Sequence, residues 1–168
     1  MNAREQKRIF DDWLETHRGL FFKVVRSYAF TPHDQDDLFQ EIATQVWHSI
    51  PKFRRDAKAS TWIYRVALYS AMAWSKKERR YRERIEVVEE FEPTLLKPLK
   101  QSNGQLNWLF EQIGQLNEID RSLTLLMLDG YSYREIAETL GITENHVGVK
   151  VSRIKKQLSE KLEKESVV

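Results

Sequence analysis

The chain has 168 residues, of which 41% are hydrophobic, and its 27 Lys and Arg nearly balance its 25 Asp and Glu, giving a formal net charge of +2. This hydrophobic fraction can fill a packed core, which excludes a wholly disordered chain, and the length suits one or two domains. No cysteine is present, so disulfides and cysteine-based metal sites are excluded, which fits a reducing compartment.

The pattern of residues favours an all-α protein. Only 6 Gly and 4 Pro occur, and no long stretch alternates apolar and polar residues as a half-buried strand does. The N-terminal "MNAREQKRIF" is charged, and no run approaches the roughly 18 apolar residues that span a bilayer. We therefore expect a soluble cytoplasmic protein.

Two helices are expected at the start of the chain. Apolar residues at three- and four-residue steps from Phe10 to Tyr28 predict one long first helix. Pro32 breaks it, and the acids that follow suit the positive end of a second helix. Pro51 ends this second helix, whose expected core residues are Leu38, Phe39, Ile42, Val46 and Trp47.

A third helix leads into a stretch of different character. Ser60 or Thr61 can cap this helix, which continues to Arg84. The following "IEVVEEFEPTLLKPLKQSNG" is acidic, holds two prolines and ends in Ser-Asn-Gly, which is typical of an extended linker. Helical spacing resumes at Leu106. We therefore expect a linker over residues 84–104, between an N-terminal domain of residues 1–83 and a C-terminal domain of residues 105–168.

Residues 131–158, "YSYREIAETLGITENHVGVKVSRIKKQL", have the pattern of a helix-turn-helix. Ser132 and Glu135 have the spacing of a capping box, and Gly141 can take the left-handed conformation that a sharp turn needs. Thr143 can cap the second helix. The residues expected to face inward are Ile136, Ala137, Leu140, Val147, Val151, Ile154 and Leu158.

The outward face of that second helix has chemistry that suits DNA. Residues 145–158 hold four basic side chains and no acid. Asn and Arg can make paired hydrogen bonds to base edges, whereas Lys mostly contacts phosphate. The alternative for this pattern is a two-helix corner of a bundle with a solvated basic face. The outward set comprises Asn145, His146, Gly148, Val149, Lys150, Ser152, Arg153 and Lys156.

The first half of the chain offers two further surfaces. Aromatic and basic residues are mixed between residues 62 and 81, which is the chemistry of single-strand binding. Aromatics at helical spacing are more often core, and we expect Trp62 and Trp74 to be largely buried. The second surface is acidic and lacks a His or Cys at ligand spacing, so protein docking is favoured over metal binding; its residues are Asp37, Gln40, Glu41 and Thr44.

Taken in order, "DQDDLFQEIATQVWHSIPKFR", "STWIYRVAL", the acidic linker and "LLMLDGYSYREIAETLGITENHVGVKVSRIKKQL" resemble a bacterial sigma factor of the extracytoplasmic-function group. The resemblance covers nearly the whole chain. It implies two small helical domains joined by a flexible linker, the second a helix-turn-helix. It also implies a factor that binds core RNA polymerase, recognises the −35 and −10 elements of promoter DNA, and is held by an anti-sigma factor. We expect no cofactor, no metal and no small-molecule substrate.

The resemblance assigns three sets of site residues. Those that match the polymerase-docking segment are Asp37, Leu38, Gln40, Glu41 and Thr44. Those that match the part binding the partly single-stranded −10 element are Arg54, Arg55, Lys58, Ser60, Thr61, Trp62, Arg65 and Tyr69. Those that match the helix reading the double-stranded −35 element are Thr143, Glu144, Asn145, His146, Gly148, Val149, Lys150, Ser152, Arg153 and Lys156. The linker would lie in the polymerase cleft.

Four positions depart from the family pattern. Arg55 stands where the family usually has Gly, and Tyr69 stands where it often has Asn. At two further positions, where many members have Lys or Arg followed by Ser, this chain has Gly148 and Val149. Because Gly148 and Val149 offer shape and methyl contact rather than hydrogen bonds, more of the reading is expected to fall on Asn145, His146, Lys150 and Arg153.

Other functions receive less support from the residues. A helix-turn-helix regulator acting without the polymerase would need a sensory or dimerisation domain, and no phosphoacceptor-bearing pattern is visible. A helical protein-binding adaptor would not need the basic second helix. An enzyme is not expected, because no phosphate-cradling glycine loop, HExxH motif or supported Ser/His/Asp set occurs and the 4 histidines are scattered.

Overall fold

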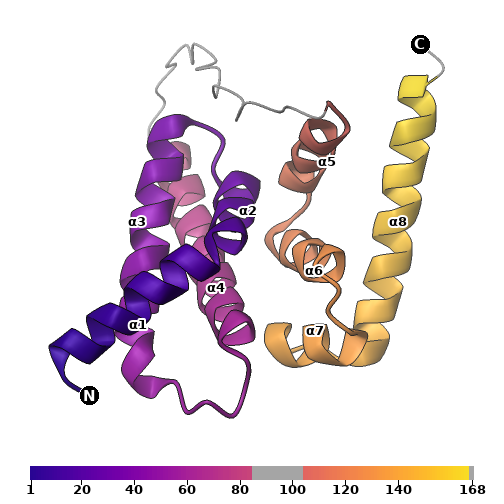
Figure 1. Ribbon diagram of the computed structural model, residues 1–168. Helices are drawn as coiled ribbons and strands as arrows, with labels where there is room; N and C mark the ends of the chain where they lie inside the picture. Colours follow the sequence, from indigo (N-terminus) through magenta and orange to yellow (C-terminus); the bar gives the residue numbers. More distant parts are fainter. Residues whose placement is uncertain (85–103, 167–168) are drawn as a thin grey trace. The chain divides into compact units, whose positions relative to one another are not determined.

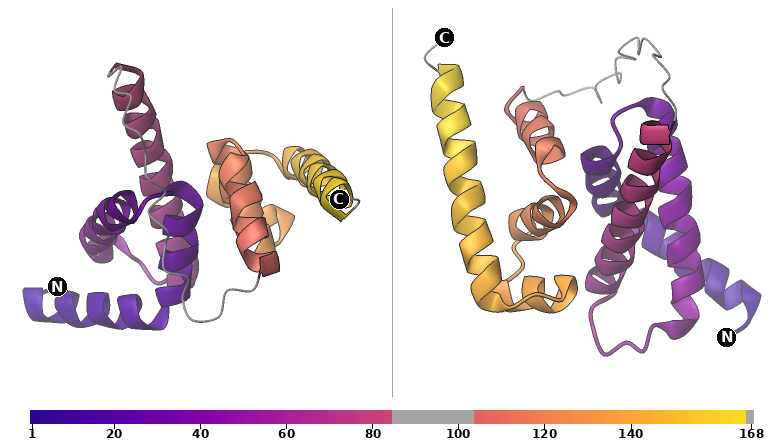
Figure 2. Two further views of the ribbon diagram at one scale, coloured as in Figure 1. Left: turned by 90° about the horizontal axis from the view of Figure 1, so that it is seen from above. Right: turned by 180° about the vertical axis from the view of Figure 1, so that it is seen from behind.

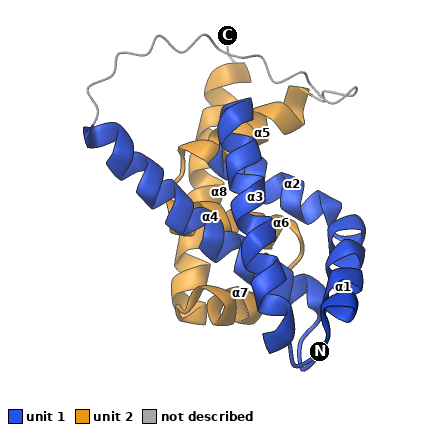
Figure 3. Ribbon diagram, turned by 90° about the vertical axis from the view of Figure 1, so that its left-hand side faces the viewer, with its two compact units in different colours: residues 1–102 blue, residues 103–168 orange. Residues whose placement is uncertain are grey.

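The structure is a computed structural model that describes residues 1–84 and 104–166. The described residues form eight α-helices and one short 3-10 helix but no strand, which confirms the predicted all-α class. They fall into two compact units, residues 1–102 and 103–168 (Figure 3). The predicted linker lies outside the described residues except at its ends, where Arg84 still belongs to one helix and Gly104 begins the next.

Each unit has its own set of helices (Figure 1). Those of unit 1 are α1 (Ala3–Thr16), α2 (Arg18–Tyr28), α3 (Pro32–Ser49), the 3-10 helix η1 (Ile50–Lys52) and α4 (Ala59–Arg84). Those of unit 2 are α5 (Gly104–Gln115), α6 (Glu118–Leu128), α7 (Tyr133–Leu140) and α8 (Glu144–Ser166).

A break at His17 divides the predicted long first helix in two, so that prediction was wrong. The His17 N–H donates to the Trp13 carbonyl at 3.0 Å and closes α1, while the His17 carbonyl accepts the Leu20 N–H at 3.0 Å and opens α2. α1 buries Trp13, and α2 buries Leu20 and further side chains after it. Since the apolar spacing continues through the break, the change of direction between the two helices (Figure 1) leaves no mark on the periodicity.

The centre of unit 1 is the contact between α3 and α4, which lie side by side (Figures 1 and 2). The completely buried side chains of these two helices are Leu38, Ile42, Val46, Ile63, Ala67, Leu68 and Ala71. Two predicted core residues of α3 differ. Phe39 is 40% exposed because it stands one position beyond the buried row at four-residue spacing. Trp47 is half-buried, edge-on to Phe10 with ring centroids 5.4 Å apart.

An aromatic cluster anchors the loop between η1 and α4. The Phe53 ring lies 5.3 Å from the Trp13 ring and 5.7 Å from the Trp62 ring, centroid to centroid. The Trp62 indole N–H donates to the Ser49 hydroxyl at 3.0 Å. The predicted caps at Ser60 and Thr61 were wrong, because α4 already begins at Ala59 and its first bond joins the Trp62 N–H to the Lys58 carbonyl.

In unit 2 the predicted helix-turn-helix is present. Ser132 and Glu135 form the expected capping box, and the Thr143 hydroxyl accepts the His146 N–H at 3.1 Å. α6 contacts both α7 and α8, and its residues 121–126 are buried. The inward side chains of α8 are as predicted for Val147, Val151 and Ile154, whereas Leu158 is only half-buried.

Gly141 makes the turn between α7 and α8. Its φ of 69° lies in the left-handed region, and its N–H donates to the Ala137 carbonyl to close α7. A side chain there would meet no neighbouring atom, so the cost of substitution is conformational rather than steric. The direction in which α8 leaves α7 therefore depends on a backbone state that glycine adopts most easily.

We predict that Gly141→Ala destabilises unit 2 by about 1–2 kcal/mol, the cost of a Cβ in the left-handed region. Amide hydrogen exchange in α7 and α8 measures this locally. Gly19→Ala is the matched control: Gly19 lies inside α2, also with nothing near a Cβ, and Ala there should stabilise by about 0.5–1 kcal/mol. Equal effects of the two substitutions would show that the turn does not depend on Gly141.

Candidate nucleic-acid and protein interfaces

An open groove runs along the outer face of α8. It is lined by Tyr133, Glu144, Asn145, Gly148, Val149, Ser152, Arg153 and Lys156. Seven of these eight residues belong to the ten that the sequence predicted to face the −35 element. Of the other three, Thr143 caps the helix, His146 is exposed beside the groove, and Lys150 points elsewhere. The groove brings together two cations, one carboxylate, one amide and two hydroxyl groups beside the apolar side chain of Val149.

Tyr133 is a groove residue that the sequence analysis missed. It is the first residue of α7 and is 43% exposed. Its ring lies 3.6 Å from where a Cβ on Gly148 would stand, so the two helices meet there across the groove. That distance is an ordinary contact, and an alanine at position 148 would fit. The place of Tyr133 in the groove could not be predicted from residue spacing, because it depends on how α7 crosses α8.

Lys150 corrects the predicted outward set. Its ammonium lies 2.7 Å from a carboxylate oxygen of Asp120 on α6, and both side chains are only 13% exposed. Position 150 falls three residues after Val147 and four before Ile154, on the buried face of α8. Lys150 therefore joins α8 to α6, and the groove keeps Arg153 and Lys156 as its cations.

The predicted −10 residues lie on the η1–α4 loop and the first turns of α4. Ser60, Thr61 and Trp62 are half-buried, whereas the exposed members are Arg54, Arg55, Lys58, Arg65 and Tyr69. The Arg65 guanidinium lies 5.9 Å from the centre of the Tyr69 ring, and Tyr69 is 43% exposed. Trp62 and Trp74, which were expected to be largely core, are both only half-buried. Cations and partly accessible aromatic faces thus share one end of unit 1.

Arg55 has an unusual backbone in this loop. Its φ is 62°, in the left-handed region. An L-residue with a Cβ pays roughly 1–2 kcal/mol there, and a long unbranched side chain such as arginine offers no local hydrogen bond that would reduce this cost. The position is therefore strained where the family resemblance would place a glycine.

On α3 the predicted docking residues Asp37, Gln40, Glu41 and Thr44 are exposed, whereas Leu38, which the resemblance also placed in that set, is buried as its apolar spacing predicted. Leu38 is completely buried against the core and offers no atom to a partner, so its place in the docking set was wrong. The Glu41 carboxylate accepts a hydrogen bond from the Gln45 amide at 3.0 Å. The Asp37 carboxylate lies 3.3 Å from the His33 ring nitrogen, an ion pair when His33 is protonated.

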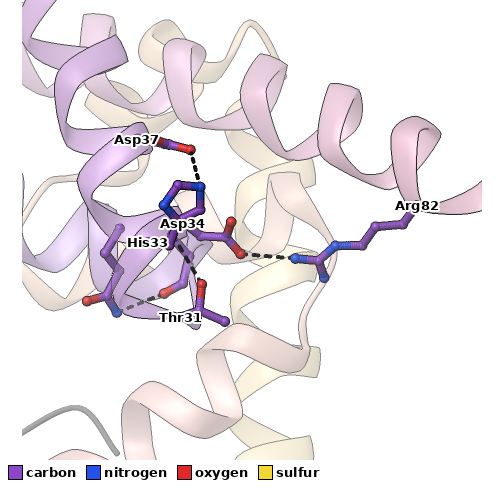
Figure 4. A network of polar contacts seen from close by, with 7 residues as sticks. Thr31, His33, Asp34, Asp37 and Arg82 are labelled. Atoms are coloured by element: carbon purple, nitrogen blue, oxygen red, sulfur yellow. Dashed lines mark hydrogen bonds and ion pairs between the residues drawn. The ribbon is translucent and has the colours of Figure 1, made fainter. Parts of the chain in front are cut away.

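The start of α3 is held by polar contacts (Figure 4). The Thr31 hydroxyl accepts the Asp34 N–H at 3.1 Å and caps the helix. The Asp34 carboxylate pairs with the Arg82 guanidinium at 3.0 Å, which ties the first turn of α3 to the last turns of α4. These contacts fix the end of α3 from which the acidic face begins.

A second groove, part apolar and part acidic, lies beside that face. It is lined by Asp11, Leu14, Glu15, Arg18, Phe21, Phe22, Val25, Gln35, Asp36 and Phe39. Two of its aromatic side chains are prominent on the surface, Phe22 at 43% and Phe39 at 40% exposure. This groove was not predicted from the sequence, because Phe39 was expected to belong to the core. Exposed aromatics within a polar rim are typical of protein-binding surfaces.

No group of three or more His, Asp or Glu side chains in residues 1–84 and 104–166 is placed to hold a metal ion. No helix in the described part of the chain combines the length and apolar character that a membrane span requires.

Comparison with known proteins gives two family matches in chain order. Sigma-70 region 2 matches residues 13–81, and Sigma-70 region 4 matches residues 106–158. Relatives include the ECF RNA polymerase sigma-E factor of Escherichia coli strain K12, 26% identical over 77% of this chain and 74% of that protein. RNA polymerase sigma factor SigV of Bacillus subtilis is 23% identical over 90% of this chain and 89% of its own length.

Two solved structures share the fold. One is CnrH in complex with the cytosolic domain of CnrY, with a TM-score of 0.65 and 22% identity over 94% of this chain and 89% of that chain. The other is the sigma factor RpoE of Bartonella quintana in complex with the anti-sigma factor NepR, with a TM-score of 0.70 and 19% identity over 94% of this chain and 98% of that chain.

The inward position of Lys150 has a measurable consequence. Removing either residue of the Lys150–Asp120 pair leaves the other charge mostly buried and unpaired. We therefore predict that Lys150→Ala and Asp120→Ala each destabilise unit 2 by about 1–3 kcal/mol, a smaller loss than breaking a fully buried pair would cause. Denaturant unfolding measures this. Lys156→Ala, on the exposed face, is the control and should change stability by less than about 0.5 kcal/mol. If Lys150→Ala left stability unchanged and lowered the salt dependence of DNA binding, Lys150 would be a phosphate contact after all.

Proposed function

The chain belongs to the sigma-70 family, in its extracytoplasmic-function group, and from this we propose how its surfaces divide the work of a sigma factor. A sigma factor binds core RNA polymerase and directs promoter-specific initiation through the −35 and −10 elements. The observation that carries the proposal is that sigma-70 regions 2 and 4 occur in this order along the chain. Each region also has an exposed groove whose chemistry suits its role: apolar and acidic in region 2 for protein docking, and polar and basic in region 4 for DNA. Region 2 lies in unit 1, and region 4 lies in unit 2.

The groove on α8 is proposed to read the −35 element in double-stranded DNA. A helix whose N-terminal half is exposed can enter the major groove, where Asn145 and Arg153 can pair with base edges. Val149, 55% exposed, and Tyr133 supply apolar surface for thymine methyl groups. Lys156 suits a phosphate contact.

The loop before α4 and the start of α4 are proposed to bind the −10 element as it becomes single-stranded. Unstacked bases bind to aromatic faces while cations follow the backbone. Tyr69 offers the more accessible ring and Trp62 a partly covered one, whereas Arg54 and Lys58 are exposed cations on the loop. The aromatic cluster around Phe53 holds this loop to the core, so these groups are positioned before DNA arrives.

The docking surface for core polymerase is proposed to be larger than the sequence predicted. The acidic face of α3 adjoins the groove that exposes Phe22 and Phe39. An apolar patch with charged residues at its rim has the composition of a protein interface, in which buried aromatics supply affinity and charges supply orientation and speed. Asp37, Gln40 and Glu41 would then lie at the rim.

An anti-sigma factor is the further partner that we propose. The two similar solved structures are both complexes with protein partners, in one case a named anti-sigma factor. A protein that covered Phe22 and Phe39 would both remove exposed aromatic surface and compete with the polymerase. Because its proposed partner is RNA polymerase, we expect the chain to act in the cytoplasm. Its role needs no catalytic residues, cofactor or small-molecule substrate of its own.

In vitro transcription with core polymerase on genomic fragments tests this function. We expect transcripts from a small set of promoters with shared −35 and −10 sequences, only when both the chain and core polymerase are present. Core polymerase alone is the control. Transcription that is absent, or that starts at the same sites without the chain, would contradict the proposal.

The docking surface makes a separate prediction. Asp37→Lys with Glu41→Lys should weaken binding to core polymerase at least tenfold through charge reversal at the interface rim, while stability changes by less than roughly 0.5 kcal/mol per site. Glu160→Lys with Glu163→Lys makes the same change of charge on exposed residues of α8 and should leave polymerase affinity intact. Equal losses for the two double variants would indicate a general charge effect rather than a docking site.

A further inference from the structure

Gly148 is a residue that the fold of unit 2 does not explain. It lies inside α8, where glycine is less stable than alanine. Its φ is not positive, unlike those of Gly130 and Gly141. A Cβ would also fit, because its nearest neighbours beyond α8 would be ring carbons of Tyr133 at 3.6 and 3.9 Å. A glycine that serves neither conformation nor packing is typical of a place that another molecule approaches closely.

The space that Gly148 leaves open has an aromatic wall. Tyr133, at the start of α7, is 43% exposed, and its side chain makes no hydrogen bond or ring contact within the described part of the chain. Val149 follows Gly148 and is 55% exposed, and all three residues line the groove of α8. We name this space, bounded by Tyr133, Gly148 and Val149, the α7–α8 notch. It has room for one carbon atom in ordinary contact with the ring.

An apolar notch in a groove that reads DNA selects one feature of the bases. In the major groove, base edges present hydrogen-bond donors and acceptors, and the apolar group among them is the C5-methyl of thymine. Many members of the family have Lys or Arg and then Ser where this chain has Gly148 and Val149. Those side chains would fill the notch and form hydrogen bonds instead. A methyl-sized apolar notch is therefore a feature of this chain rather than of the family.

We propose that the α7–α8 notch holds the C5-methyl group of one pyrimidine in the −35 element, so that this position is read through a methyl group and not through a hydrogen bond. The proposal rests on the proposed function. Thymine and 5-methylcytosine carry the same methyl group, so the notch suits either base. Gly148 then lacks a side chain because a Cβ would stand where the methyl group binds.

The test measures the affinity of holoenzyme, reconstituted from core polymerase and the full chain, for duplexes of one promoter recovered by the transcription assay. Each thymine of the −35 element, on either strand, is replaced in turn by deoxyuridine, which lacks only the methyl group. At the most sensitive position, cytosine and 5-methylcytosine are compared in the same way. The readout is the ratio of the affinities for the methylated and unmethylated probes, so a general loss of folding or of DNA binding cancels for each variant.

For the wild type, thymine at one position should be bound about threefold more tightly than deoxyuridine, the effect of one partly buried methyl group, and 5-methylcytosine should exceed cytosine similarly. Tyr133→Phe keeps the ring and should keep this ratio, whereas Tyr133→Ala should abolish the difference. Gly148→Ala should abolish or reverse it, because its Cβ displaces the methyl group, and should raise the melting temperature of the free chain. Tyr81→Ala removes another exposed tyrosine, from α4, and is the matched control that should keep the wild-type ratio.

Several results would overturn the proposal. They are equal wild-type affinities for every thymine and deoxyuridine probe, or a −35 element that contains neither thymine nor 5-methylcytosine. A ratio that survives Tyr133→Ala would show that the methyl group acts through the shape of the DNA. A ratio that survives Gly148→Ala, or a lower melting temperature of that variant, would show that the glycine does not make room for the methyl group.

The source of the methyl group is identified by the template. Transcription from amplified, unmethylated promoter DNA assigns it to thymine, whereas transcription from native genomic DNA alone assigns it to 5-methylcytosine. In each of these results the wild-type holoenzyme still initiates. None can therefore be confused with failure of the proposed function, in which the wild type would direct no initiation.

Discussion

The packing of α3 against α4 decides which side chains of unit 1 are free to bind. Leu38, Ile42 and Val46 are buried against α4, and this row turns the acidic residues of α3 outward. The same contact turns Arg65 and Tyr69 of α4 away from the core. A helix has one face for its core and another for solvent, so burying these apolar rows leaves exposed the two surfaces that we propose for protein docking and for DNA.

In unit 2, a turn and an ion pair fix which face of α8 is exposed. Gly141 sets the direction of α8, and the Lys150–Asp120 pair ties that helix to α6, so the groove residues Asn145 and Arg153 are presented together. Rigid support of this kind reduces the ordering cost of binding. The loop at Arg55 follows the same logic in unit 1, because the aromatic cluster around Phe53 holds a strained backbone and its free cation in place.

The sequence was enough to predict features that depend on local rules. The capping box at Ser132, the turn at Gly141 and the buried row after Thr143 follow from spacing and residue type over a few positions. Features that depend on how helices meet were missed. The α1–α2 break at His17 leaves the apolar spacing unchanged, and the exposure of Phe39 and the place of Tyr133 depend on crossing helices. The inward turn of Lys150 was visible in the spacing, since it shares the face of Val147 and Ile154, but its charge suggested solvent.

The central claim is that core polymerase and promoter DNA bind separate faces of the helices. Hydroxyl-radical footprinting of exposed aromatic side chains tests this claim most directly. Free chain, holoenzyme and holoenzyme with promoter DNA would be compared at Phe39, Tyr69 and Tyr133, which are 40%, 43% and 43% exposed. We predict that Phe39 loses reactivity when core polymerase is added, and that Tyr69 and Tyr133 lose reactivity when promoter DNA follows. Phe39 that stays reactive in the holoenzyme, or Tyr69 and Tyr133 that are indifferent to DNA, would contradict this assignment.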